Sequence, residues 1–239
     1  MQQTNSLEKM RFLSGSWLKL IAVVLMFIDH ATLILLKDVP SFHAPLLQLG
    51  NKALTVYEIL RQIGRPAFPI FCFLVAEGYV HTGNRKKYGR NLLIFALLSE
   101  IPYNLMLGGQ VLHPASQNVF VTLFLGFLFM EIWNRDWPEL WKILAFLVVA
   151  ALALAARSDY GIRGAVLVLL MYALRERKPL RMILAYPMLS GGAAAFMAFV
   201  PISLYNGQRG FIRGKWMKYA FYMFYPVHIL LLWIVKQYL

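Results

Sequence analysis

The sequence predicts an all-α polytopic membrane protein, and three observations carry this prediction. Hydrophobic residues make up 59% of the 239 residues, and charged residues only 15%. The mean hydropathy is +0.58, whereas a soluble chain usually carries about a quarter charged residues. Apolar runs recur along the whole chain, and no linker or change of composition separates them. We therefore expect a single membrane domain over residues 1–239.

The apolar runs predict a single bundle of about eight transmembrane helices, since a spanning helix needs about 20 mostly apolar residues. Windows of this kind fall near 17–36, 66–83, 91–107, 118–134, 138–156, 160–174, 180–204 and 216–237. The segment near 46–62 also has apolar residues at helical spacing, but it carries Lys52, Glu58 and Arg61. We expect it to form a helix in the membrane interface rather than a span.

Basic residues in the loops predict the orientation, because cytoplasmic loops are enriched in Lys and Arg. If 46–62 stays on the surface, the runs RKKYGR (85–90) and RERKPLR (175–181) fall on one side together with both termini, which places the N- and C-termini in the cytoplasm. The basic loop 206–218 then falls on the outer side. Either the topology breaks near 190–216, where Gly and Pro allow a broken helix, or that loop has an anionic partner.

The net charge of +13 does not require a nucleic acid. The basic loops and the anionic headgroups of membrane lipids account for much of it, so the expected partners include lipids and exclude nucleic acid. The single cysteine, Cys72, cannot form an internal disulfide. No two histidines have the spacing of a helical metal site, so we expect no metal.

Five ionisable residues lie near the middle depth of the predicted spans, where each costs about 2.5–3.5 kcal/mol on insertion scales. They are Asp29, His30, Glu77, Glu100 and His228. Consecutive helical residues point about 100° apart, so Asp29 and His30 each need a partner on another helix. His30 is a natural proton acceptor near neutral pH. The alternative for this pair is a polar contact that only holds helices together.

Glu77 and Glu100 have stronger structural explanations, whereas His228 lies too deep to belong to an interfacial aromatic belt. Glu77 lies four residues before His81 and can pair with it on one helix face. Glu100, in SEIPYN, fits a kinked segment that lines a cavity. In the last predicted helix, Tyr219, Tyr222, Tyr225 and His228 recur every three residues and form a polar stripe.

The ordered set of these motifs resembles the TraX family over nearly the whole chain. The matching segments are LKLIAVVLMFIDH (18–30), GRPAFPIFCFLVAEGYVHTGN (64–84), KKYGRNLLIFALLSEIPYN (86–104), NVFVTLFLG (118–126), DYGIRG (159–164), NGQRG (206–210) and KYAFYMFYPVH (218–228). The family is named for the conjugative-pilus enzyme that acetylates the amino terminus of pilin. It is similar to wider transmembrane acyltransferases that move acyl groups from acyl-CoA, so the resemblance implies an acyltransferase, with acetyl-CoA or another acyl-CoA as donor, in the bacterial cytoplasmic (inner) membrane.

The resemblance also implies roles for individual residues. His30 would be the base that activates an acceptor amine or hydroxyl, and Asp29 would orient or balance the site. The remaining family-matching polar positions would bind donor or acceptor: Arg65, Asn206, Arg209, Tyr222, Tyr225 and His228. We add Glu77 and Glu100 as substrate-binding candidates because they are intramembrane carboxylates. A charge argument assigns the phosphates of coenzyme A to Arg85, Lys86, Lys87, Arg90, Arg175 and Arg177.

Several points stay open in the sequence. Transfer can be direct or can pass through an acyl-His intermediate, since no Gly-x-Ser-x-Gly elbow is present. The acceptor can be a peptide amino terminus, a sugar or a lipid-linked substrate. The competing hypothesis is a small proton-coupled transporter or channel that uses the same five ionisable residues as a relay. A third is a non-catalytic membrane partner of a secretion or envelope complex.

Overall fold

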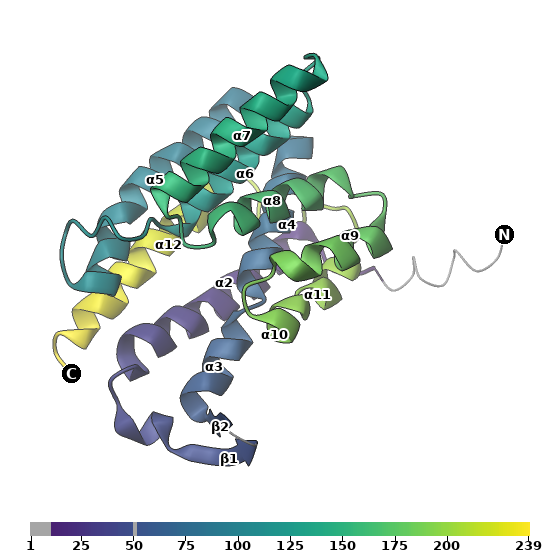
Figure 1. Ribbon diagram of the computed structural model, residues 1–239. Coiled ribbons are helices and arrows are strands. Elements are labelled where there is room, and N and C mark those ends of the chain that lie inside the picture. Colours follow the sequence, from purple (N-terminus) through teal and green to yellow (C-terminus); the bar gives the residue numbers. More distant parts are fainter. Residues whose placement is uncertain (1–10, 50–51) are drawn as a thin grey trace, which may run out of the picture. The chain divides into compact units, whose positions relative to one another are not determined.

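The computed structural model describes residues 11–49 and 52–239, and these are almost entirely helical (Figure 1). Among the described residues, five helices are long and apolar enough to cross a membrane: Gly15–Leu36, Val56–His81, Arg85–Gly108, Glu139–Ala156 and Lys215–Lys236. Three further apolar helices are shorter: Val119–Trp133, Gly161–Ala173 and Gly192–Ser203. The all-α membrane class is confirmed, and the eight predicted windows separate into five long helices and three short ones.

The chain divides into two compact units. Unit 1 comprises Met1–Phe71 and Gly191–Leu239, and unit 2 comprises Cys72–Ser190. The prediction of a single domain over 1–239 stays a prediction, and the units are described separately.

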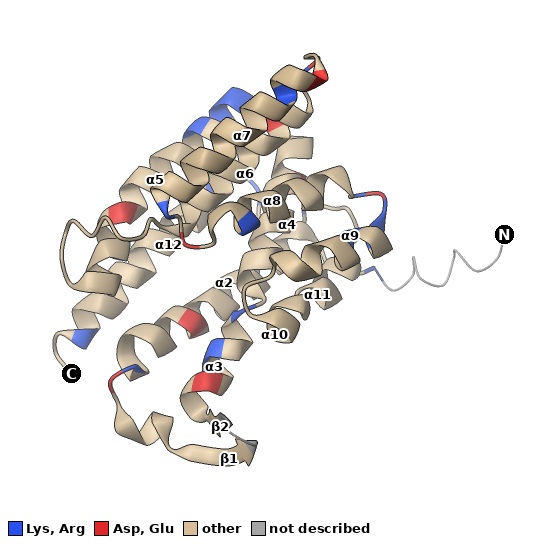
Figure 2. Cartoon of the chain, in the orientation of Figure 1, with Lys and Arg blue, Asp and Glu red and all other residues tan. Residues whose placement is uncertain are grey.

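Unit 1 contains the first and last helices of the described chain. Its elements are α2 (Gly15–Ala31), a π-helical turn (Thr32–Leu36), a short 3₁₀ turn (Pro40–His43), β1 (Pro45–Leu49), β2 (Lys52–Thr55), α3 (Val56–Gly64), the start of α4 (Ala67–His81), α10 (Gly192–Phe196), α11 (Phe199–Ser203) and α12 (Lys215–Lys236). The strands β1 and β2 form an antiparallel hairpin. Figure 2 shows no charge colour on α10 and α11.

The predicted interfacial helix over 46–62 is wrong in its first half. Residues 45–49 and 52–55 form the hairpin, and the helix begins only at Val56. The cause is a cap: the Thr55 side-chain oxygen accepts a hydrogen bond from the Glu58 backbone N–H at 3.2 Å. Thr-x-x-Glu is the sequence of a capping box, which starts a helix at the residue after the Thr. This signal was present in the sequence.

Within unit 1, α2 and α12 run parallel. Where α2 begins, the Gly15 N–H donates to Gln208 O at 2.8 Å, so the loop before α12 lies there. Farther along both helices, His30 contacts His228. Beyond the end of α2, Asp38 pairs with Lys236, the last residue of α12, at 2.7 Å.

This parallel course bears on the predicted topology. If both helices cross the bilayer, residues 15 and 236 lie on opposite sides of it. The placement of both termini in the cytoplasm stays a prediction. The predicted span at 180–204 is broken into short pieces, and α10 and α11, with five residues each, cannot cross a hydrocarbon layer about 30 Å thick. The basic loop 206–218 lies at the start of α2, where its backbone bonds to Gly15 and Ser16.

Unit 2 is built around α6. Its elements are the rest of α4, α5 (Arg85–Gly108), α6 (Val119–Trp133), α7 (Glu139–Ala156), α8 (Gly161–Ala173), α9 (Lys178–Ala185) and a 3₁₀ turn (Tyr186–Met188). A buried core joins Phe129 of α6 to Val149 and Ala153 of α7 and to Ala165 of α8. Most of α7 is exposed in the structure, including Leu147 and Leu154, as expected of a lipid-facing helix.

Candidate functional site

The centre of unit 1 is a pair of histidines on α2 and α12. His30 Nδ1 lies 2.7 Å from His228 Nε2, and the two rings stack with centroids 5.0 Å apart. His228 is only 4% exposed. The Tyr225 ring meets His30 edge-on at 5.7 Å, and Phe224 stacks on His228 at 4.6 Å. His30 stands just before the π-helical turn, a local distortion that is frequent at functional sites.

The hydrogen bonds of this pair fix which nitrogen of neutral His30 carries the proton. His228 Nδ1 lies 2.6 Å from Phe224 O, and a carbonyl oxygen can only accept, so Nδ1 of His228 is the donor. Neutral His228 then has an unprotonated Nε2, which accepts from His30 Nδ1. Nε2 of neutral His30 is therefore left with a free electron pair. Within the described residues, no hydrogen bond occupies this atom. It is positioned as a proton acceptor.

Asp29 faces a different helix from His30. An oxygen of its carboxylate lies 2.6 Å from Arg61 of α3, and the same guanidinium donates to Asp29 O at 3.1 Å. Both side chains of this ion pair are 17% exposed. Gly64 allows the close approach, because a Cβ at that position would overlap the Asp29 side chain. The prediction that Asp29 and His30 each need a partner on another helix is confirmed.

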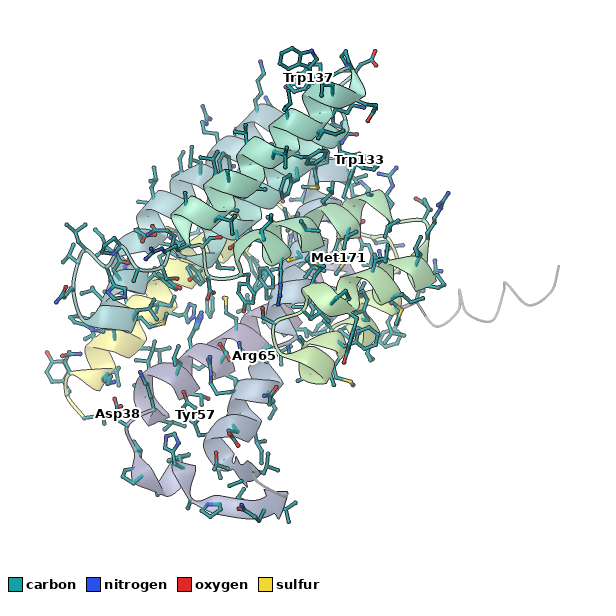
Figure 3. The ribbon with its side chains drawn as sticks, viewed as in Figure 1. Asp38, Tyr57, Arg65, Trp133, Trp137 and Met171 are labelled. Atoms are coloured by element: carbon teal, nitrogen blue, oxygen red, sulfur yellow. The ribbon has the colours of Figure 1, made fainter. Side chains whose placement is uncertain are left out.

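Two polar atoms beside this ion pair are buried without a hydrogen-bond partner among the described residues. They are Asp29 Oδ1 and Arg65 Nε. Arg65 occupies the predicted turn between α3 and α4 (Figure 3) and interacts electrostatically with Asp29. Its aliphatic stem lies against Gly191, where an added Cβ would approach Cγ to 3.0 Å. A bound polar group can therefore donate a hydrogen bond to Asp29 Oδ1 and accept one from Arg65 Nε.

The motif NGQRG places Asn206 and Arg209 at the start of α2, away from the histidine pair. The Asn206 N–H donates to Leu13 O at 2.9 Å, and Ser16 donates to Arg209 O through both its N–H and its hydroxyl. Gly210 has φ +85°, and a Cβ there would overlap the hydroxyls of Ser14 and Ser16. Gly210 is therefore required for the loop to pack against the start of α2. The Oδ1 of Asn206 accepts from the Gln208 N–H at 2.9 Å within the loop. The roles of Asn206 and Arg209 in substrate binding stay predictions.

The tyrosines predicted on α12 differ in how deeply they are buried in the protein. Tyr225 is buried at the histidine pair. Tyr222 lies one turn earlier, where the Lys218 ammonium stands 5.8 Å from its ring centroid.

The two predicted carboxylates of unit 2 have local partners. Glu77 pairs with His81 at 3.5 Å, which confirms the contact expected from their spacing, and it also interacts electrostatically with Arg181. Glu100 accepts a 2.6 Å hydrogen bond from Asn118 Nδ2. The role of both residues in substrate binding stays a prediction.

The six basic residues assigned to coenzyme A are exposed and belong to unit 2. The two stretches meet through aromatic rings: the Arg85 guanidinium stands 4.4 Å from the Tyr79 ring, and the Arg175 guanidinium stands 5.5 Å from the Tyr172 ring. Tyr79 and Tyr172 pack edge-on at 5.2 Å. The basic runs at 85–90 and 175–177 thus gather at one end of unit 2. Their binding to coenzyme A stays a prediction.

Arg61 is the main site residue that the sequence did not identify. It was assigned to an interfacial surface, although a buried Asp29 demands a cation. The spacing of Arg61 and Gly64 was a usable signal, since residues three apart share a helix face and a glycine there permits close contact. Within the described residues, no group of three or more His, Cys, Asp or Glu side chains could hold a metal ion.

Comparison with known proteins decides the relationship. The family model described as TraX protein matches residues 14–236. The chain belongs to the TraX family. A relative within the curated proteins, the probable fimbrial assembly protein FimC of serogroup H1 from Dichelobacter nodosus, is 29% identical to the chain over 254 residues. The match covers 95% of this chain and 97% of that protein. No solved structure matches the chain significantly.

Proposed function

We propose that this TraX-family protein is an integral membrane acyltransferase. It moves an acyl group, in the simplest case acetyl, from acyl-CoA to an amine or hydroxyl of an acceptor at the membrane. The observation that carries the proposal is the chain of hydrogen bonds from His30 to His228 and from His228 to Phe224 O. These bonds place the proton of neutral His30 on Nδ1 and leave Nε2 free to accept one.

The chemistry follows from this atom. As the acceptor nitrogen or oxygen attacks the thioester carbonyl, His30 Nε2 takes the proton that the acceptor loses. The resulting imidazolium still donates through Nδ1 to His228, which stabilises its charge. The C–S bond then breaks, and the proton on Nε2 passes to the departing sulfur, which leaves as the free thiol of coenzyme A. An acyl-His route uses the same atom as nucleophile.

The Asp29 and Arg65 side chains support binding of a polar acceptor group. Asp29 Oδ1 can accept a hydrogen bond from an acceptor N–H or O–H, and Arg65 Nε can donate to a carbonyl or carboxylate. Arg61 bonds the other carboxylate oxygen at 2.6 Å, so Oδ1 is available as an acceptor.

Charge supports an orientation in which the start of α2 faces the cytoplasm. The described residues at this end include six basic side chains, Arg11, Lys19, Arg209, Arg213, Lys215 and Lys218, and the positive-inside rule favours such an end for the cytoplasm. In this orientation the carboxyl terminus lies outside the cytoplasm. Acyl-CoA would then approach from the end where α2 begins.

The relative from Dichelobacter nodosus, with its printed role in fimbrial assembly, supports a fimbrial or pilin-type subunit as the acceptor. The amino terminus of such a subunit is an amine, which suits a proton acceptor of the strength of imidazole. We therefore place peptide amines first among the acceptors to be tried, ahead of sugars and lipid-linked substrates.

Release of coenzyme A thiol from acetyl-CoA tests the proposal. The protein, purified into lipid nanodiscs, is assayed with and without a panel of pilin amino-terminal peptides and small amines. We expect turnover in the wild type, a loss of 10²-fold or more in His30→Ala, and little change in His81→Ala, whose ring is 64% exposed. Equal turnover in the wild type and His30→Ala would contradict the proposal. If neither turns over acetyl-CoA, proton flux in liposomes tests the transporter hypothesis.

A further inference from the structure

One arginine of unit 2 is buried although no acceptor engages its guanidinium. Arg181 lies in the first turn of α9 and is only 4% exposed. Its Nε is buried, and within residues 11–49 and 52–239 neither a hydrogen bond nor a salt bridge reaches its guanidinium. The guanidinium carbon stands 5.4 Å from the centroid of the Phe73 ring on α4. A ring face attracts a cation but does not replace the oxygen acceptors that a buried guanidinium needs, so an anion is required to complete this site.

A carboxylate lies on the same face of α4 as the ring that Arg181 contacts. Phe73 and Glu77 are four residues apart on α4, which makes their side chains neighbours with Cβ atoms about 5–6 Å apart. Glu77 pairs at 3.5 Å with His81, one turn farther along, and that ring carries a charge only when it is protonated. In the described part of the chain, no salt bridge joins Glu77 to Arg181. A cationic and an anionic side chain therefore share this face of α4 without pairing directly.

These side chains lie where an apolar helix ends. His81 is the last residue of the helix Val56–His81, which is long and apolar enough to cross a membrane, and its ring is largely exposed. The ends of spanning helices lie at the depth of the lipid headgroups. On α9, Ile183 and Leu184 follow Arg181 closely and are exposed apolar side chains. A lipid is therefore the ligand that fits, because its head meets the polar side chains while its acyl chains cover apolar ones.

We propose that Arg181 and Glu77 bind the headgroup of an aminophospholipid of the phosphatidylethanolamine type. The phosphate accepts hydrogen bonds from the Arg181 guanidinium, and the ammonium, two carbons away, donates to the Glu77 carboxylate. Each side chain then meets a group of the opposite sign. A phosphate without the ammonium would bring a second anion next to Glu77, which is unfavourable. The inference does not depend on the proposed acyl transfer, and it gives Glu77 a ligand other than the acyl acceptor.

Native mass spectrometry of the full chain in detergent, with lipid adducts counted at defined lipid concentrations, tests the site. In the wild type we expect phosphatidylethanolamine to bind more tightly than phosphatidylglycerol, which has no ammonium, or phosphatidylcholine, whose methylated ammonium has no N–H to donate. Arg181→Gln should weaken phosphatidylethanolamine binding about tenfold or more, since it removes charged hydrogen bonds to phosphate. Glu77→Gln should remove the preference for phosphatidylethanolamine without weakening phosphatidylglycerol. The matched control is Arg163→Gln, which changes an exposed arginine of α8 and should alter binding less than twofold.

Three results would overturn the inference. The first is equal phosphatidylethanolamine affinity in the wild type and Arg181→Gln. The second is an unchanged headgroup preference in Glu77→Gln, and this variant keeps the test decisive if Arg181→Gln does not fold. The third concerns the source of the phosphate: we expect water-soluble phosphoethanolamine to compete only weakly with the lipid, and equally tight binding of the two would show that the site serves a soluble ligand.

Discussion

Two polar contacts inside apolar helices differ in what their partners can do. In unit 1, His30 of α2 contacts His228, a second titratable group. In unit 2, Glu100 of α5 accepts from Asn118, whose Nδ2 also donates to Ala96 O at 2.8 Å. The Asn118 Oδ1 accepts from the Phe120 N–H at 3.0 Å and so caps the start of α6. Glu100 thus holds a helix cap in place through an amide that cannot take up a proton.

The difference shows that intramembrane charge alone does not identify a reaction centre. Both contacts satisfy a costly polar group, as the bilayer requires. Only the histidine contact leaves a basic nitrogen without a partner among the described residues. The partner of an ionisable residue is therefore more informative than the residue itself.

The largest effect on stability should come from breaking the ion pair next to the histidines. Arg61→Ala removes the ion-pair partner of the largely buried Asp29 carboxylate, which then keeps only its weaker interaction with Arg65, and we expect the free energy of unfolding to fall by about 3–5 kcal/mol. Unfolding in mixed micelles with a denaturing detergent measures this. Arg61→Ala with Asp29→Asn should recover much of the loss, because the carboxylate charge that Arg61 balanced is then also removed. A double variant as unstable as Arg61→Ala would show that the charge of Asp29 is not the cause.

Replacing His228 tests whether it orients His30 for catalysis. His228→Leu removes the acceptor of His30 Nδ1, so the proton of neutral His30 is free to occupy Nε2. We expect kcat for thiol release to fall about 100-fold with KM for acetyl-CoA unchanged. His228→Gln, whose amide oxygen can accept the same hydrogen bond, should retain much more activity. Equal losses in the two variants would mean that His228 does not act by orienting His30.

The corresponding change in unit 2 should affect stability by less. Glu100→Leu leaves the Asn118 amide without its side-chain acceptor, and we expect a loss of about 1–3 kcal/mol. Glu100→Gln keeps an oxygen at the same place and should cost clearly less. If the two variants are equally unstable in the same detergent titration, the charge of Glu100 matters beyond the cap of α6.

The smallest effect concerns the far ends of α2 and α12. The hydrogen bond and charge of Lys236 lower the pKa of the exposed Asp38 carboxyl. The stabilising contribution is therefore present above the usual Asp pKa of about 3.9 and is lost as pH falls through the lower pKa of the folded state. We expect Asp38→Asn to lower Tm slightly at pH 7, less in 1 M salt, and not at all well below that folded pKa. A Tm difference that grows on acidification would contradict the contact.

The membrane class and most helices could be predicted from the sequence because lipid solvation depends on local composition. The directions in which the helices run relative to one another could not be predicted from it. The parallel arrangement of α2 and α12 follows from contacts between residues 15 and 208 and between residues 38 and 236, which no local pattern encodes. The Thr55 cap that starts α3 was readable, but the apolar spacing of 46–62 was given more weight.

The candidate site shows the same limit. Asp29, His30 and His228 could be singled out because polar residues in apolar runs are costly. That His30 contacts His228 rather than Asp29, and that Arg61 completes the ion pair, depends on how α2, α3 and α12 pack. The angle between adjacent residues predicted separate partners, but it could not name them.

The most direct measurement is nitrogen NMR of the protein labelled with ¹⁵N-histidine in lipid nanodiscs, with His30 assigned by comparison with His30→Ala. At neutral pH we predict that His30 is protonated at Nδ1 and bare at Nε2, and that His228→Leu redistributes this proton. A His30 ring that carries its proton at Nε2 in the wild type would contradict the central claim, because that atom could not then act as the base.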